Sequence, residues 1–274
     1  MKESLLCCSV CGQPLTFDEK NARCPKEHCF DRAARGGYVH LLRQHRRGSS
    51  DPGDSAAMCQ ARTRFLEGNW YGPLRDTVAK LAADCAPKDI LDAGCGEGYY
   101  TGKLEACLRE KGISPRVAGF DISKSAVRAA AGKYKGCQFA VASAFAVPAA
   151  DASADCLTNV FAPIVPEECK RVVKPGGVMI LAVPGPRHLY GLKEILYDAP
   201  YENEYRETEY PGFVFVRRET VAETLILDNG EQIQNLFAMT PYYWKTPESG
   251  SRRLAQTAHL ETEIRFDFLI YRRK

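Results

Sequence analysis

The stretch Asp89-Ile-Leu-Asp-Ala-Gly-Cys-Gly-Glu-Gly-Tyr-Tyr-Thr101 decides the fold of this chain. A short apolar run ends at Leu91, three glycines follow at alternate positions, and residues 98–111 have the pattern of a helix. This order predicts a strand, a tight glycine turn and the start of a helix. Such a turn lets backbone N–H groups and the positive helix end approach a ligand closely, because glycine accepts positive φ and has no Cβ to collide.

The spacing of the glycines separates two ligand classes. A dinucleotide site needs G-x-G-x-x-G, but here the third glycine comes one residue early and Tyr99 occupies its place, which disfavours NAD. The form Asp92-x-Gly94-x-Gly96-x-Gly98 resembles motif I of the class I S-adenosylmethionine (SAM) methyltransferases. A second apolar run ends at Asp121, where a carboxylate can accept hydrogen bonds from both ribose hydroxyls. A purely structural glycine turn in another α/β protein is the alternative.

Beyond this turn, strand and helix patterns alternate. Such alternation predicts a parallel, doubly wound sheet whose ligands lie at the carboxyl ends of the strands. The last apolar segment, residues 260–271, has every second residue apolar and is expected to be a half-buried strand. The tyrosine- and glutamate-rich residues 197–211 have no clear period and are interpreted as a surface loop or a substrate lid. Strands are expected at 89–93, 116–121, 137–141, 154–161 and 177–183, and helices at 56–67, 74–86, 98–111, 123–133 and 166–173.

Cysteine spacing near the N-terminus indicates a metal site. Cys8-x-x-Cys11 presents two thiolates from a tight turn, and Cys24-x-x-x-His28 follows after a short hairpin to complete a tetrahedron. Four protein ligands make a closed, structural zinc site, and the metal would stabilise a segment too small to fold alone. A redox C-x-x-C would need a thioredoxin-like βαβ context, which is missing. Cys7 and Cys29 lie next to proposed ligands and leave substitution open, and residues 36–42 are expected to form the last strand of this module.

Composition sets the broad class. The 274 residues carry a net charge of +3 and are 45% hydrophobic, which predicts a globular protein. Neither a signal peptide nor a membrane span is evident, so we expect a cytoplasmic protein, and the seven cysteines beyond residue 29 are expected to be reduced. Residues 46–55 have linker composition, which divides the chain into a zinc-binding RNA-recognition module (1–45), a linker (46–55) and a methyltransferase domain (56–274).

The motifs taken together resemble one family from end to end. The zinc module, Arg43-Gln-His-Arg-Arg47, the glycine turn, Val173-Lys-Pro-Gly-Gly177 and Pro184-Gly-Pro-Arg-His-Leu189 are similar to those of the RlmA-type 23S rRNA (guanine-N1)-methyltransferases. The resemblance implies a Rossmann-like, mostly parallel seven-stranded sheet with an antiparallel last strand, and a zinc-ribbon-like module. It implies zinc at Cys8, Cys11, Cys24 and His28, and SAM contacts at Tyr71, Gly96, Glu97 and His188, beside Asp92, Gly94, Gly98 and Asp121.

The family also implies a reaction. It methylates N1 of one guanine in a 23S rRNA hairpin that lines the peptide exit tunnel. Two subgroups modify neighbouring guanines, and in one of them the methyl group contributes to macrolide (tylosin-like) resistance; the sequence does not separate them. A homodimer is expected by resemblance, and RNA contacts are expected at Arg43, Arg46 and Arg47, although a solvated face explains a charge run equally well.

Three questions stay open at this level. Glu167 and Glu168 are candidate acceptors for the N1 proton, but acidic residues also favour the first turn of any helix, so no catalytic base is assigned. A small-molecule methyltransferase, acting on a quinone or another metabolite, is the main alternative function. A non-catalytic RNA-binding protein is a weaker one, because Asp92, the three glycines and Asp121 are all present.

Overall fold

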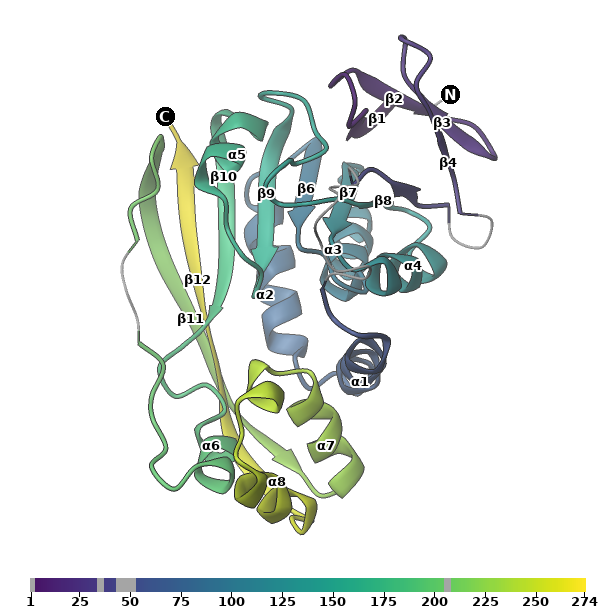
Figure 1. Cartoon of the computed structure of the whole chain (residues 1–274). Helices are drawn as coiled ribbons and strands as arrows, with labels where there is room; N and C mark the ends of the chain where they lie inside the picture. The colour runs from purple at the N-terminus through teal and green to yellow at the C-terminus, as the bar shows by residue number, and fades with distance from the viewer. Residues whose placement is uncertain (1–2, 34–36, 43–52, 205–207) are drawn as a thin grey trace.

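An eight-stranded mixed sheet forms the centre of the computed structural model, which describes residues 3–33, 37–42, 53–204 and 208–274 (Figure 1). The strands from β10 to β5 run parallel, β12 is antiparallel to β10, and β11 pairs antiparallel with β12. The predicted class I SAM methyltransferase fold is thus confirmed, with one strand more than expected. In spatial order the strands are β11 (Phe213–Leu227), β12 (Leu260–Arg273), β10 (Val173–Pro184), β9 (Ala154–Val160), β6 (Asp89–Ala93), β7 (Arg116–Asp121), β8 (Gln138–Val141) and β5 (Val39–His40).

Helices cover one face of this sheet. α2 (Gly72–Ala83) and α3 (Tyr99–Glu110) bury their apolar sides against alternate residues of the strands, such as Ile90 and Val117. α4 (Lys124–Lys133) packs beside them on β8. Five consecutive buried residues in β6 show why its sequence reads as a continuous apolar run: both faces of the strand are covered.

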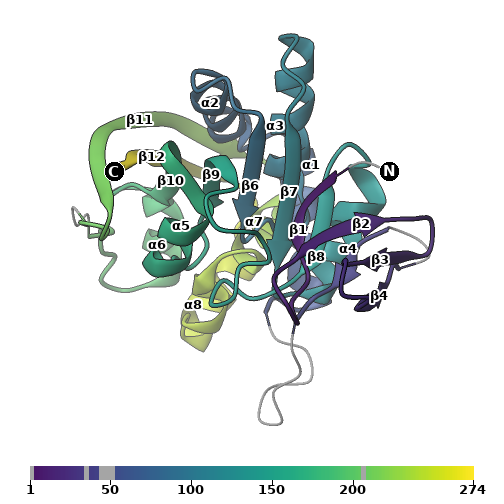
Figure 2. The ribbon, with the colours of Figure 1, turned by 90° about the horizontal axis from the view of Figure 1, so that it is seen from above.

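The opposite face is closed partly by the N-terminal module. Its four strands, β1 (Glu3–Cys7), β2 (Pro14–Phe17), β3 (Asn21–Arg23) and β4 (Cys29–Asp31), form an antiparallel sheet of their own. Leu5 and Leu6 of β1 pack in one core cluster with Phe120 of β7, and α5 (Pro166–Val172) covers the same face further along. The purple module lies against the β7–β8 side of the sheet (Figure 2).

One strand was predicted in the wrong sheet. Residues 36–42 were expected to close the small module, but β5 pairs in parallel with β8, with Val39 opposite Ala140. A single bridge between Arg32 and Val39 links it to the module. The sequence pattern shows that this segment is extended, but not which edge it joins. Module and methyltransferase sheet therefore share a continuous core.

The C-terminal third builds a layer beyond the carboxyl ends of the parallel strands (Figure 1). β11 and β12 form a long hairpin, and the segment between them holds α7 (Gly230–Ala238), the 3-10 helix η1 (Pro241–Trp244) and α8 (Glu248–Ala255). α6 (Tyr190–Leu196) packs on β12 and α8, and α1 (Ala56–Glu67) packs on α7. The Asn229 side chain caps α7 by accepting a 2.7 Å hydrogen bond from the N–H of Glu231. Within the described residues no helix is long and apolar enough to cross a membrane.

Candidate active site and metal centre

The glycine turn lies at the carboxyl end of β6. Gly94, Gly96 and Gly98 have φ of 78°, 52° and 77°, the left-handed region that other residues seldom adopt. A Cβ on Gly94 would fall well inside 3.0 Å of the Ala162 Cβ, whereas at Gly96 the nearest atom beyond the neighbouring residues would be Arg62 Nη1 at 3.7 Å. The first glycine is needed for packing, and the second leaves space in front of the backbone.

Two aspartates hold this turn in place. Asp92 is buried and accepts a 2.8 Å hydrogen bond from the Thr158 hydroxyl and another from the Thr101 hydroxyl. Burial raises the pKa of Asp92 to about 6, an effect that these hydroxyls oppose. Asp121 accepts the Gly96 N–H at 3.0 Å and the Ser123 N–H at 2.8 Å. Asp92 thus fixes the strand behind the turn, and Asp121 fixes the turn itself.

A buried ion network flanks the turn. Glu97 is only 6% exposed, and its Oε2 has no hydrogen-bond partner in the described structure, although Arg62 Nη1 lies 3.5 Å away. Arg62 also pairs with Asp54, which the sequence had assigned to the linker. A buried carboxylate oxygen that accepts no hydrogen bond, beside open backbone, can accept one from a hydroxyl or ammonium group of a ligand. SAM carries both a ribose diol and an amino group, so these residues suit it.

Tyr71 and His188 meet on the other side of the site, 117 residues apart in sequence. The Nδ1 of His188 accepts the Arg265 N–H at 3.2 Å. Burial, with a smaller effect from the Lys193 charge, lowers the pKa of His188 to about 3, so the ring is neutral. Its Nε2 must therefore carry the proton and donate it to the Tyr71 oxygen, 3.2 Å away. The Tyr71 hydroxyl hydrogen is left free for another acceptor.

Two further residues near the carboxyl ends of the strands differ in their roles: Glu168 has a structural role, whereas the exposure of Phe161 has no structural explanation. Glu168 accepts the Val147 N–H at 2.7 Å and pairs with Arg171 at 2.7 Å, so it anchors a loop and is not free to take a proton. Phe161, 43% exposed at the end of β9, was not singled out by the sequence analysis. A single phenylalanine has no motif of its own, and only the fold places it beside His188, with ring centroids 6.0 Å apart.

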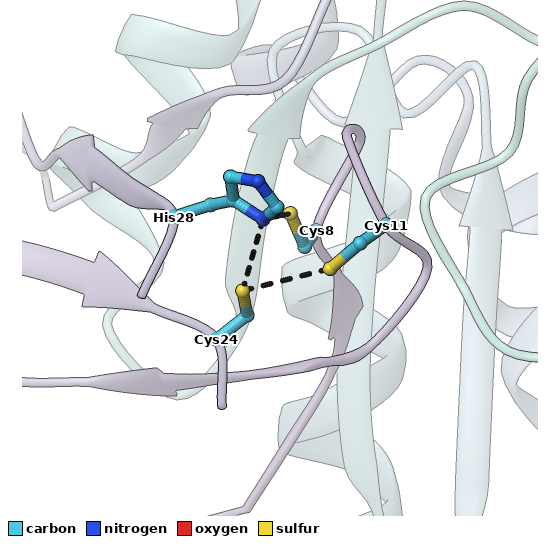
Figure 3. A group of neighbouring side chains, drawn as sticks. All are labelled: Cys8, Cys11, Cys24 and His28. Atoms are coloured by element: carbon cyan, nitrogen blue, oxygen red, sulfur yellow. Dashed lines mark hydrogen bonds between the residues drawn. The ribbon is translucent and has the colours of Figure 1, made fainter. Parts of the chain in front are cut away.

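The four predicted zinc ligands lie together in the N-terminal module (Figure 3). Their ligand atoms are all within 4.8 Å of one another, with Cys11 Sγ 3.6 Å from Cys24 Sγ and Cys24 Sγ 3.3 Å from His28 Nδ1. Tetrahedral bonds of about 2.3 Å to zinc would place two sulfurs about 3.8 Å apart, so the cluster suits this ion. Cys7 and Cys29 are not part of it. Arg43, Arg46 and Arg47 lie outside the described residues.

Comparison with known proteins places these sites in one family. Residues 6–50 match the model of the RlmA N-terminal zinc ribbon, and residues 90–177 match a methyltransferase domain. A 23S rRNA (guanine(748)-N(1))-methyltransferase of Streptomyces fradiae is 33% identical over 91% of this chain and 89% of its own length. YxjB of Bacillus subtilis, assigned as a candidate 23S rRNA (guanine-N(1)-)-methyltransferase, is 28% identical over 97% of this chain and 96% of its own. The chain therefore belongs to the RlmA-type 23S rRNA guanine-N1-methyltransferases, enzymes that use SAM and carry a zinc ribbon.

Proposed function

We propose that this chain methylates N1 of a single guanine in the tunnel-lining hairpin of 23S rRNA, at the position that the Streptomyces fradiae relative modifies. The observation that carries the proposal is the similarity to that relative, which extends over both the zinc ribbon and the methyltransferase domain. The shared core of the two parts supports it, because the module lies against the sheet that bears the glycine turn.

We assign the cofactor contacts as follows. SAM, when bound, supplies a methyl group already activated on a sulfonium. Gly94, Gly96 and Gly98 give it backbone access, Asp121 and Glu97 offer carboxylates to its hydroxyl and amino groups, and Tyr71, oriented by His188, offers a hydroxyl donor. The protein must align N1 with this methyl group, an effect worth roughly 7–11 kcal/mol in well-oriented reactions, and the N1 proton must pass to an acceptor as the new bond forms.

We assign the module to the RNA and its zinc to Cys8, Cys11, Cys24 and His28. Arg43 lies at the end of the module, and Arg46 and Arg47 follow it in sequence, so the three would contact phosphates while the methyltransferase domain takes the base. Replacing all three by alanine should weaken RNA binding and flatten its salt dependence, with unchanged SAM affinity. An unchanged RNA affinity would contradict this assignment. Such a role implies a cytoplasmic enzyme. We also propose that the protein is a homodimer, as the family resemblance implies.

Methyl transfer from labelled SAM to 23S rRNA that lacks its modifications tests the function. N1 methylation blocks base pairing, so primer extension should stop at one guanine, the counterpart of position 748. A stop at a neighbouring guanine would keep the reaction but correct the position. Absence of transfer to rRNA while SAM still binds would favour the small-molecule alternative. If the position is as proposed, expression in a macrolide-sensitive host should raise tylosin resistance.

A further inference from the structure

Phe161 has a large apolar side chain that is exposed at the site, and packing in the fold does not explain this exposure. It follows β9 directly, and 43% of its surface is accessible. The part that is covered contacts the aromatic cluster: its ring centroid lies 6.0 Å from that of His188 and 6.0 Å from that of Phe266. One part of the ring is thus supported by protein while the rest meets solvent.

The backbone at Phe161 is held in an unfavourable conformation. Its φ is 56°, and among the described residues it is the only aromatic one with a positive φ. For a bulky side chain this conformation costs free energy of about 1–3 kcal/mol, and such strain persists where the surroundings impose it, often at functional sites. The positive φ turns the chain away from β9 at the residue that carries the ring.

Hydrogen bonds fix this turn from two sides. The N–H of Phe161 donates to the Ala182 carbonyl at 3.1 Å, which ties it to β10. The Asn159 amide donates to the Ala93 carbonyl at 2.9 Å, which ties the end of β9 to β6 and the glycine turn. The next residue in the chain, Ala162, lies so close to Gly94 that residue 94 has no room for a Cβ. The backbone that carries the ring is therefore held in place relative to the glycine turn.

The order of the strands indicates what the ring faces. Asp121, the carboxylate expected at the ribose, ends β7 on one side of β6, whereas Phe161 follows β9 on the other side. The two residues thus flank the glycine turn from opposite sides. The ribose end of the cofactor, assigned to Asp121, would then lie toward β7, whereas the acceptor of the methyl group would approach from the β9 side, where Phe161 lies beside His188.

We infer that Phe161 is the stacking platform for the target guanine, which rests on the proposed function. Proteins recognise unstacked RNA bases by stacking them on aromatic side chains, and a base that reacts at its pairing edge must leave its helix first. A guanine stacked on Phe161 has its plane fixed by the ring, and its N1 edge can then be turned toward the methyl group. The aromatic face is the only property of the side chain that this role requires.

Two variants at the same position test the platform. Phe161→Leu keeps an apolar side chain and the same backbone strain but removes the ring, while Phe161→Tyr keeps the ring. Turnover on unmodified 23S rRNA should fall about 5- to 150-fold in Phe161→Leu, the range of one base–aromatic stack, and stay near wild type in Phe161→Tyr. SAM affinity, measured by calorimetry without RNA, should be unchanged in both, since the ring is assigned to the base and not to the cofactor.

The outcomes separate this inference from the function itself. Equal turnover in wild type and Phe161→Leu, with methylation at the expected guanine, would overturn the platform alone. A parallel loss of SAM affinity in Phe161→Leu would overturn it too, because the ring would then act on the cofactor site, directly or through its contact with His188, and not on the base. If wild-type protein does not methylate rRNA at all, the proposed function fails and the platform fails with it.

Discussion

Replacing Gly94 by alanine should destabilise the glycine turn and weaken SAM binding. Replacing Gly112 by alanine provides a matched control. Both glycines have φ of 78°, so alanine at either position incurs the same left-handed strain, about 1–2 kcal/mol. They differ in their surroundings. A Cβ on Gly112 would have nothing within 4 Å, whereas on Gly94 it would collide with the Ala162 Cβ.

The difference between the two variants isolates the collision. Overpacking in a well-packed core typically costs 1–3 kcal/mol, so Gly94→Ala should lower the free energy of unfolding by roughly 2–5 kcal/mol in all, against roughly 1–2 for Gly112→Ala. Any effect of alanine on the entropy of the unfolded chain is common to both variants and cancels. Gly94→Ala should also weaken SAM binding, because the turn can relieve the collision only by moving.

Urea unfolding and calorimetric SAM titration measure both effects. Adding Ala162→Gly to Gly94→Ala removes the colliding methyl group and should recover most of the lost stability, leaving only the backbone strain. Equal stability and equal SAM affinity for Gly94→Ala and Gly112→Ala would refute the reasoning, since they would mean that Ala162 does not press on the turn.

Three further predictions concern protons and metal. Burial raises the pKa of Asp92 to about 6 from an unfolded value near 3.9. The free energy of unfolding should therefore fall by at most about 3 kcal/mol as the pH rises between these two values. Thermal melts of Asp92→Asn should lack this dependence on pH. His188, with its pKa lowered to about 3 by burial, stays neutral in the fold, whereas in the unfolded chain it gains a proton below about pH 6.5, so stability should fall as pH drops below that value. His188→Gln should lose this dependence and retain stability in acid, and an unchanged acid limb would contradict the buried neutral ring. Elemental analysis should find one zinc ion per chain. Cys24→Ser should lose the zinc and show lower amide protection in β1 and also in β7, which β1 covers. The control Cys29→Ser, at an exposed cysteine outside the cluster, should keep both the zinc and the amide protection.

Local sequence signals predicted the central fold well. The strand–turn–helix around Gly94 and the alternation that follows it depend on residues close in sequence, and β6, β7 and α1 have the predicted bounds. The strand β12 was also expected from its alternating pattern, but it is not half-buried as predicted, because residues 266–271 are all buried between neighbouring elements. In contrast, the long β11 has mostly exposed or half-buried residues, so its pattern lacks the apolar stripe from which a strand of this length could be predicted.

The parts that sequence did not reveal depend on distant contacts. Arg62 gave no signal in α1, because its partners Asp54 and Glu97 are met only after folding. Likewise β5 joins β8 rather than the module, and β1 covers the sheet as a helix otherwise would. Deleting residues 1–45 would therefore expose the core around Phe120, so it is no clean test of whether the methyltransferase domain works alone.

The central claim is that this fold transfers one methyl group to N1 of one guanine. The most direct test is mass spectrometry of nucleosides from unmodified 23S rRNA after incubation with the protein and SAM. We predict a gain of one 1-methylguanosine per rRNA molecule, with no other methylated nucleoside. No gain, or a gain of a different methylated nucleoside, would contradict the account.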